Sequence, residues 1–479
     1  RRHQVPTAHL ATAVPRSPAS LLRAEQEVVT FFGRGWVLQQ LTLWCEDVDA
    51  IAVRLVVAPG GYGKTRLARQ LAGRMSDWKH WPVGAGSEAE IAARVTAGDV
   101  PDRLLITVDY ADARPGADLA QLLCAAAHPG RGQVRLLLLA RAVGPWWTDM
   151  SDTHPGQGAL VDALTSSQHV IDLPARADDR TPNEIIYSAM AAFAARLHRE
   201  PPTGYLPGLH DPETPLLRLH AEALLAVLGT PTGRDGPIDV LKELLKHEAR
   251  YWRGQARQAA LPLPPNRRQA DMVCRQLVGL AALLGADSDG EVAGVVRRVP
   301  SLVNVDPETV ETYVDWLRML YPTEQTDPVG RLGTLQPDLL AEHLAVDALH
   351  GLSVVHREAV FTAITGPQAA RALTVLGRAN AHRSEAAGLI EDALAAAPVT
   401  MAGAVIVTAT RFPGVFAARC AQVLAAARIE LAELVELARL VPYPSLELAC
   451  VGLVLEERIV AHPDLAAASP ERGTWLNSF

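Results

Sequence analysis

The chain has 479 residues, a formal net charge of −8 and a sequence isoelectric point near 6.0. Its length suggests about three or four domains, and an apolar fraction of 49% with only 5% aromatic residues predicts cores of Ala, Leu and Val in packed helices. The acidic charge argues against a surface that neutralises nucleic-acid phosphates over its whole face, and no apolar run reaches the ~20 residues of a membrane span.

The first segment and the cysteines indicate a cytoplasmic protein. Residues 1–20 are rich in Pro, Ser and Ala and begin with Arg1, so we interpret 1–24 as a linker from a domain that precedes this sequence. No signal-peptide pattern is present. The five cysteines are far apart and lack C-x-x-C spacing, which predicts buried free thiols in a reducing cytosol rather than disulfides or a zinc site.

Residues 51–70 combine a β-branched apolar run, a glycine-rich turn and a helical pattern, which predicts a strand, a loop and a helix. Glycines let the main chain curl closely enough for several N–H groups to reach a triphosphate. In this Walker A pattern the lysine reaches the β- and γ-phosphates and the following hydroxyl is a ligand for Mg²⁺. The matching residues, with Ala58 in place of the first glycine, are Pro59, Gly60, Gly61, Tyr62, Gly63, Lys64, Thr65 and Arg66.

A second apolar run, residues 104–108, ends in Asp109, which is the Walker B arrangement of a buried parallel strand that delivers a carboxylate to the magnesium ion. The acidic neighbour that activates water is absent, because Tyr110 and Ala111 follow. The next carboxylate, Asp112, is a further candidate for the catalytic site. We therefore expect hydrolysis to be slow.

Two later runs complete the predicted sheet. Residues 134–140 end at Arg141, which is either a sensor of the γ-phosphate or a surface arginine that begins a loop. Residues 169–173 form a short strand before a capping box at 181–184 that begins a long helix. The alternation predicts a parallel, three-layer α/β domain over 25–178, with its ligand at the carboxyl ends of the strands.

These residues together resemble the STAND class of P-loop NTPases, signalling switches related to NACHT and NB-ARC proteins. The segment 29–34 is similar to the F-x-GR-E entry motif of that class, and 60–68 to its GGxGKTxLA motif. The resemblance implies nucleotide contacts from Phe32 and Arg34. It also implies a contact of Pro215 with the adenine ring, in the place of the GxP turn, although a helix-starting proline needs no ligand.

The resemblance continues more weakly along the chain. It implies an all-α helical domain at 179–262, a winged-helix-like domain at 263–352 and helical repeats at 353–479. Near the end of the winged helix, a histidine of the family touches the β-phosphate of ADP. His343 is the candidate here, His350 is its rival, and a surface or satisfied histidine is the ordinary alternative.

The tail carries a weak 30-residue repeat that predicts helix pairs stacked into a solenoid, with one irregular helical bundle as the alternative. Four sets of residues align at this period: Ala372, Ala402 and Ala432; Val375, Val405 and Val435; Ile390, Cys420 and Cys450; and Leu394, Leu424 and Val454. The solenoid predicts a surface for a protein or peptide partner.

We therefore expect a switch that binds ATP or ADP with Mg²⁺, opens when a ligand reaches the repeats, and self-associates, as the resemblance implies, in defence against phage. The alternatives are an AAA-like ATPase or motor, which needs a catalytic carboxylate near Asp109, and a STAND-type transcriptional regulator. No basic recognition helix stands out between 300 and 350, so nucleic acid is not the expected partner. The choice between ATP and GTP is open.

Overall fold

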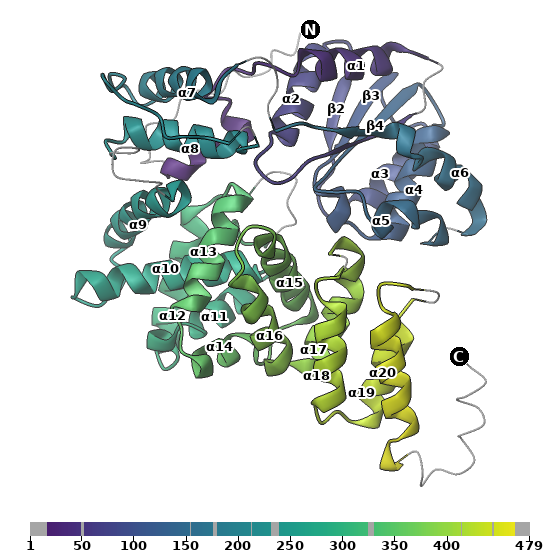
Figure 1. Cartoon of the computed structure of the whole chain (residues 1–479), viewed down its shortest axis with the longest axis vertical. Helices are drawn as coiled ribbons and strands as arrows, with labels where there is room; N and C mark the ends of the chain where they lie inside the picture. The colour runs from purple at the N-terminus through teal and green to yellow at the C-terminus, as the bar shows by residue number, and fades with distance from the viewer. Residues whose placement is uncertain are drawn as a thin grey trace.

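The computed structural model describes residues 17–48, 52–153, 155–175, 180–211, 213–230, 239–323, 330–412, 414–442 and 445–464. An α/β part is followed by a large helical part, and the two lie against each other (Figure 1). Within the described ranges no helix is long and apolar enough to cross a membrane.

The α/β part is built on a five-stranded sheet with the order β2-β3-β4-β1-β5, and every neighbouring pair is parallel. The register places Val57 opposite both Ala140 and Asp172, so β1, β4 and β5 end at the same level. The bounds are Val53–Val57 for β1, Lys79–Pro82 for β2, Arg103–Val108 for β3, Gln133–Ala140 for β4 and Val170–Asp172 for β5.

Strand β2 is absent from the sequence-based prediction. Its residues, Lys-His-Trp-Pro, are partly or fully exposed and lack the apolar run of the central strands. It forms an edge of the sheet, where proline is tolerated because one side of the strand needs no partner.

Helices cover both faces of this sheet and make three layers. Along β4 the side chains alternate, so that Leu136 and Leu138 enter one core while Leu137 and Leu139 enter the other. One face carries α1 (Gly35–Glu46) and α2 (Lys64–Arg74), and the opposite face carries α3 (Glu88–Ala97), α4 (Gly116–Ala127), α5 (Pro145–Thr148) and α6 (Gly158–Leu164).

The helical part begins at a capping box in which Thr181 and Glu184 each accept a hydrogen bond from the other's backbone N–H. Its first helices are α7 (Pro182–Arg196), α8 (Leu216–Val227), α9 (Val240–Gln258), α10 (Arg267–Leu284), α11 (Asp289–Arg297), α12 (Pro307–Leu320), α13 (Asp338–His350) and α14 (Val354–Phe361). Residues 263–323 and 330–352 contain only helices and turns, and 324–329 lie outside the described residues, so the wing expected of a winged helix is not seen in the described part.

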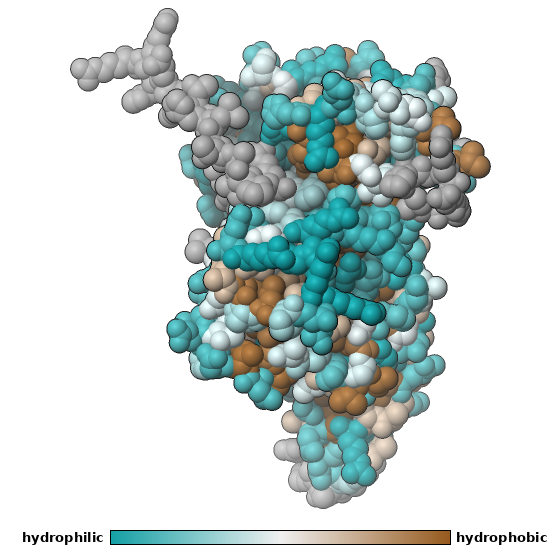
Figure 2. All heavy atoms as spheres, turned by 90° about the vertical axis from the view of Figure 1, so that its left-hand side faces the viewer, coloured by the Kyte–Doolittle hydropathy of each residue, from teal (hydrophilic) through white to brown (hydrophobic). Residues whose placement is uncertain are grey.

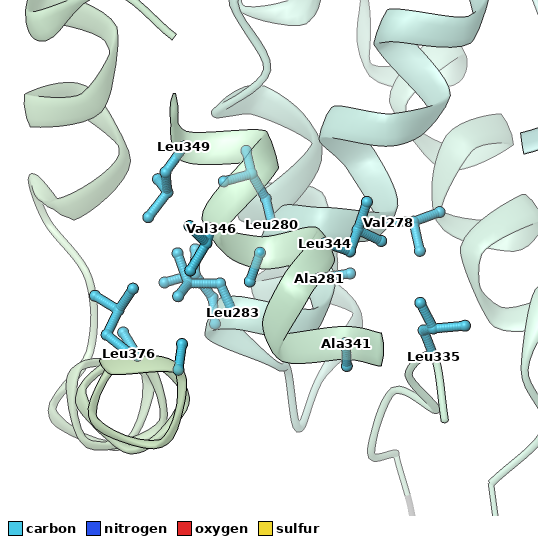
Figure 3. Close-up of a cluster of buried hydrophobic side chains, with 14 of the residues drawn as sticks. Val278, Leu280, Ala281, Leu283, Leu335, Ala341, Leu344, Val346, Leu349 and Leu376 are labelled. Carbon is cyan, nitrogen blue, oxygen red and sulfur yellow. The ribbon is translucent and has the colours of Figure 1, made fainter. Parts of the chain in front are cut away.

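One continuous buried core runs through the helical part rather than a separate core for each expected domain. Helices α10, α13 and α15 (Gly366–Asn380) meet there, and Figure 3 shows Leu280, Leu344, Val346 and Leu376 converging from these helices. At Gly279 an added Cβ would lie 2.5 Å from the Ala348 Cβ, so α10 and α13 are in very close contact. This packing fixes the position of α13.

The last six helices form three pairs, and successive pairs pack against each other through both their first and their second helices. The pairs are α15 (Gly366–Asn380) with α16 (Ala386–Ala396), α17 (Pro398–Thr408) with α18 (Ala417–Ala426), and α19 (Leu431–Leu440) with α20 (Ala449–Val460).

The sequence period of 30 slips in the third helix pair. Ala432 and Cys450 are exposed, whereas Val451 is buried and takes the place that the repeat assigned to Cys450. The remaining four cysteines are buried and free.

Residues 17–24, within the expected linker, form short 3₁₀ helices, and Ala19 is fully buried against the helical core. On the face shown in Figure 2, hydrophilic side chains gather across the middle of the molecule, with hydrophobic patches above and below them.

Candidate functional site

The glycine-rich loop lies between β1 and α2, as the sequence predicts. Gly61 and Gly63 have φ values of +83° and +85°, in the left-handed region that glycine tolerates best. The first turn of α2 begins at Lys64, so free N–H groups and the positive end of the helix face the loop. The strand, loop and helix thus have the geometry of a phosphate-binding loop.

Glycine is also required by what surrounds the loop. An added Cβ at Gly61 would lie 2.9 Å from the Leu217 Cβ and 3.5 Å from the Pro215 Cβ, and the Leu217 N–H donates to the Gly61 carbonyl at 3.0 Å. The start of α8 therefore packs directly on the loop. This is where the structure places Pro215: beside the phosphate-binding loop, at the N-cap of α8.

Two predicted magnesium ligands meet across the loop and the sheet. The Thr65 hydroxyl donates to Asp109 Oδ2 at 2.6 Å, and the Tyr110 N–H donates to Oδ1 at 2.9 Å. Burial raises the pKa of Asp109, while the Thr65 hydrogen bond and the Lys64 charge oppose that rise. A hydroxyl and a carboxylate at one point, both oxygen donors, fit the preference of Mg²⁺.

Lys64 is the first residue of α2, and its side chain reaches back to the start of the loop. Its ammonium donates to the Ala58 carbonyl at 2.6 Å and to the Pro59 carbonyl at 3.1 Å. Burial lowers the pKa of Lys64 to about 8, although the Asp109 carboxylate acts in the opposite direction. The group therefore stands where a polyphosphate would offer it stronger partners than two carbonyls.

The loop opens into a cavity of about 1190 Å³ between the α/β part and the helical part. Its walls come from residues far apart in the sequence, including 21–29, the phosphate-binding loop, the start of α8, and residues of α13 and α15. The lining is rich in cations, which is the electrostatic character expected of a polyphosphate site. They are Arg23, Lys64, Arg66, Arg69, Arg114, Arg141, Arg331, Arg371, Arg378 and Arg411.

Arg141 joins the two parts of the molecule. It follows the last residue of β4, and an added Cβ at Gly60 would lie 3.4 Å from its guanidinium carbon. The same guanidinium donates to Glu342 Oε1 at 2.5 Å and lies 3.6 Å from Asp338 Oδ2, both on α13. Burial lowers the pKa of Arg141, but the two carboxylates outweigh burial and raise the pKa above its ordinary value.

Several predicted contacts lie outside this cavity. Arg34 is buried and donates to the Pro174 carbonyl at 3.0 Å, so it ties α1 to the end of β5. The Arg180 guanidinium lies 4.3 Å from the ring centroid of Phe32. Neither Phe32 nor Arg34 lines the cavity, so the structure does not bring them to the phosphate-binding loop.

The remaining residues of the loop have structural partners. The Tyr62 hydroxyl donates to the Glu213 carbonyl at 3.3 Å, which again joins the loop to the segment before α8. Arg66 lines the cavity and lies 3.2 Å from Glu27. Pro59 also borders a second, smaller cavity of about 280 Å³ at the carboxyl ends of β1, β4 and β5.

His343 does not reach the cavity. Its Nε2 faces Asp239 at 3.5 Å and Asp347 at 3.8 Å, and burial lowers its pKa. Because consecutive residues on a helix point about 100° apart, the residue that faces Arg141 is Glu342. His350 is exposed at the end of α13 and does not line the cavity.

Asp112, predicted as a catalytic residue, also lies away from the cavity. It is buried in the 3₁₀ helix η3 (Ala111–Ala113) and does not line the cavity. Instead, Arg114 lies beside the Walker B strand, where its Nη2 donates to the Asp109 carbonyl at 3.1 Å and its Nη1 lies 3.0 Å from the buried Glu88 carboxylate. This pair holds the main chain of Asp109.

Four residues that sequence reasoning missed therefore belong to the site: Arg114, Glu342, Arg378 and Arg411. Arg114 carries a weak local signal, since it lies five residues after Asp109. The other three carry none, because nothing in the pattern of α13, α15 or the segment after α17 distinguishes a cavity residue from a surface charge.

Comparisons with known proteins give no family. No family model matches the chain, and no curated protein matches it. Among solved structures, NtrX from Brucella abortus is similar with a TM-score of 0.31 and 12% identity. The match covers 49% of this chain and 64% of the NtrX chain, so this chain spans less than two thirds of that protein. Cdc6p from Pyrobaculum aerophilum is similar with a TM-score of 0.26 and 11% identity over 67% of this chain and 98% of Cdc6p. TM-scores this low carry no argument, so the site is interpreted from its own geometry.

Proposed function

We propose that this protein is a nucleotide-dependent switch of the STAND-like kind, which binds ATP or ADP with Mg²⁺. The observation that carries the proposal is the position of Arg141, between the phosphate-binding loop at Gly60 and the carboxylates of Glu342 and Asp338 on α13. One cation therefore serves both the ligand site and the contact between the two parts of the chain.

The proposed mechanism follows from charge. Lys64 and the loop N–H groups would bind the phosphates, and Thr65 and Asp109 would hold Mg²⁺, whose chemistry would be to neutralise phosphate charge. A terminal phosphate near Gly60 competes with Glu342 for the Arg141 guanidinium, because both are anions that accept charge-assisted hydrogen bonds. Loss of the Arg141–Glu342 contact weakens the hold of the α/β part on α13, so a triphosphate and a diphosphate favour different arrangements of the two parts of the chain.

Slow hydrolysis is part of the proposal. Among the described residues that line the cavity, every carboxylate other than Asp109 is paired with an arginine: Glu25, Glu27, Asp338 and Glu342. A carboxylate held by an arginine is not free to take a proton from water, because its oxygens already accept hydrogen bonds or charge contacts from that partner. Asp109 itself is assigned to the metal.

We further propose that the stacked helix pairs of the C-terminal region bind a protein or peptide trigger and that opened molecules self-associate in the cytoplasm. The support is the open stack of pairs and the resemblance to signalling NTPases. Defence against phage is the context that the resemblance suggests. The trigger is identified only as a macromolecule that fits a helical surface.

Mass spectrometry of the nucleotide that co-purifies with the protein tests the proposal directly. We expect ADP or ATP in the wild type and neither in Lys64→Ala. Turnover of purified protein separates a switch from an ATPase motor, because dedicated enzymes turn over at about 1 per second or faster. Sustained hydrolysis in that range would reject the switch.

A further inference from the structure

Two arginines of the C-terminal helices face the candidate nucleotide site. Arg378 belongs to α15 and Arg411 ends the 3₁₀ helix η8 (Ala409–Arg411), and both line the cavity that contains Lys64. They are separated by 32 residues in the sequence. Neither belongs to the α/β part, so the C-terminal region supplies part of the wall opposite the phosphate-binding loop.

Close packing brings the two arginines together. An added Cβ at Gly377 would lie 3.0 Å from the Phe412 ring and 2.7 Å from the Phe416 ring, so these rings press on the main chain next to Arg378. The Phe412 and Phe416 rings also pack edge to face, with their centroids 5.3 Å apart. The contact between residues 377 and 412 brings the main chains of Arg378 and Arg411 close together, and the charge of Arg378 acts on Arg411.

A second contact fixes η8 against the α/β part. An added Cβ at Gly144 would lie 3.3 Å from the Thr410 carbonyl oxygen, and η8 packs on α5. Gly144 comes three residues after Arg141. The segment that carries Arg411 therefore rests on the loop that leaves the end of β4, which is the edge of the sheet where the ligand is expected.

The two arginines differ in how their charge is compensated. Arg378 lies 3.1 Å from Asp338 Oδ2, and its guanidinium lies 4.9 Å from the Tyr110 ring centroid. Arg411 is partly buried, and among the described residues no carboxylate lies within 4.0 Å of it in an ion pair. Burial lowers the pKa of Arg411; the more distant Asp112 opposes this effect and Arg378 adds to it. A cation in a cavity beside a second cation is stabilised by an anionic ligand.

The position relative to the metal site indicates which phosphate is concerned. Tyr110, under Arg378, follows Asp109, whose carboxylate and the Thr65 hydroxyl mark the expected place of Mg²⁺. Mg²⁺ held there would stabilise the negative charge of the outer phosphates of a triphosphate. Cations on the Tyr110 side therefore face the outer end of a triphosphate, which Lys64 also reaches, while the loop N–H groups serve the phosphates behind it.

We propose that Arg411, with Arg378 beside it, binds the terminal phosphate of a nucleoside triphosphate, so that the C-terminal helices detect the nucleotide directly. This inference rests on the proposed nucleotide function and adds a contact from the opposite end of the chain. It predicts discrimination between ATP and ADP, since only ATP carries the phosphate that Arg411 reaches.

Isothermal titration of the full chain with Mg-ATP and, separately, with Mg-ADP tests the contact. Arg411→Ala weakens ATP binding by at least about 10-fold, the loss expected for one charge-assisted hydrogen bond, and leaves ADP binding unchanged. Arg411→Lys keeps the charge but loses the bidentate geometry, so its loss is intermediate. Arg419→Ala is the matched control, because this arginine of the same region pairs with Glu391 and does not line the cavity.

Retained ADP affinity shows that a variant has folded. An Arg411→Ala protein that keeps its ADP affinity and also keeps its ATP affinity overturns the inference while the proposed function stands. A folded Arg411→Lys protein with the wild-type ratio of ATP to ADP affinity overturns it as well. A wild-type protein that binds neither nucleotide overturns the proposed function and this inference together.

Discussion

The carboxylate of Glu248 gives the sharpest prediction for stability. It is fully buried on α9 and accepts hydrogen bonds from the Ser17 hydroxyl at 2.9 Å, the Ala19 N–H at 2.5 Å and the Tyr321 hydroxyl at 3.1 Å. These bonds attach the first described segment, whose neighbours at 21–29 form a wall of the cavity. Burial raises the pKa of Glu248 from 4.5 to about 7, and the three donors oppose the rise.

The sign and size of the effect follow from proton linkage. Between pH 4.5 and 7 the folded protein holds a proton on Glu248 that the unfolded chain has released, so the free energy of unfolding falls as pH rises. The stabilisation is fully present below pH 4.5 and is lost as pH rises through 7. A pKa difference of about 2.5 corresponds to about 3 kcal/mol, of which about 2 to 3 kcal/mol is lost between pH 5 and 8.

Urea unfolding at several pH values between 5 and 8, followed by tryptophan fluorescence, measures this slope. Glu248→Gln cannot ionise, so its unfolding free energy varies less with pH than that of the wild type by about 2 to 3 kcal/mol over this range. Glu243→Gln on the same helix is the control, because Glu243 pairs with Lys246 at the surface. Hydrogen exchange at the Ala19 amide reports the same loss locally. Equal pH slopes in the wild type and Glu248→Gln would refute the reasoning.

Three further substitutions test the site and the core. Lys64→Ala should weaken Mg-ATP binding by at least about 10-fold in a titration, and wild-type affinity in that variant would contradict the phosphate site. Gly61→Ala should lower the unfolding free energy by about 1 to 2 kcal/mol because of its positive φ, before the contact with α8 is counted. Its control is Gly73→Ala in α2, where an added Cβ meets nothing within 4 Å, so this variant should be neutral or stabilising. Thermal unfolding measures both variants. Leu344 lies in the core shown in Figure 3, and Leu344→Ala should lower the unfolding free energy by about 2 to 5 kcal/mol. The side chain of Leu453 is 56% exposed, so Leu453→Ala should lower it by about 0.5 kcal/mol or less. Equal losses in the two variants would contradict the assigned core.

Much of the α/β part could be predicted because its determinants are local. An apolar run of five to eight residues is long enough to specify a buried strand, and it specified β1, β3 and β4. The glycines at 61 and 63 specify positive φ values by their missing Cβ. Edge strand β2 escaped prediction because its stability comes from pairing with β3 and not from its own residues.

The direction in which each side chain of α13 points could not be predicted from the sequence. The family resemblance directs attention to a histidine, but the direction in which a residue points depends on how its helix packs. The tight α10–α13 contact at Gly279 turns Glu342 toward Arg141 and His343 toward Asp239 and Asp347. The slipped third repeat has a related cause, since burial of Val451 depends on how α20 packs against α18.

The sequence by itself determined the phosphate-binding loop, the Walker B strand and the predominance of helices, because backbone sterics and hydrophobic periodicity act over a few neighbouring residues. Only the tertiary structure decided which charges face that loop. Arg141 and Glu342 are 201 residues apart and touch, and Arg411 reaches the cavity through the packing of two phenylalanines on Gly377. Such contacts depend on the mutual placement of whole helices, which no local pattern encodes.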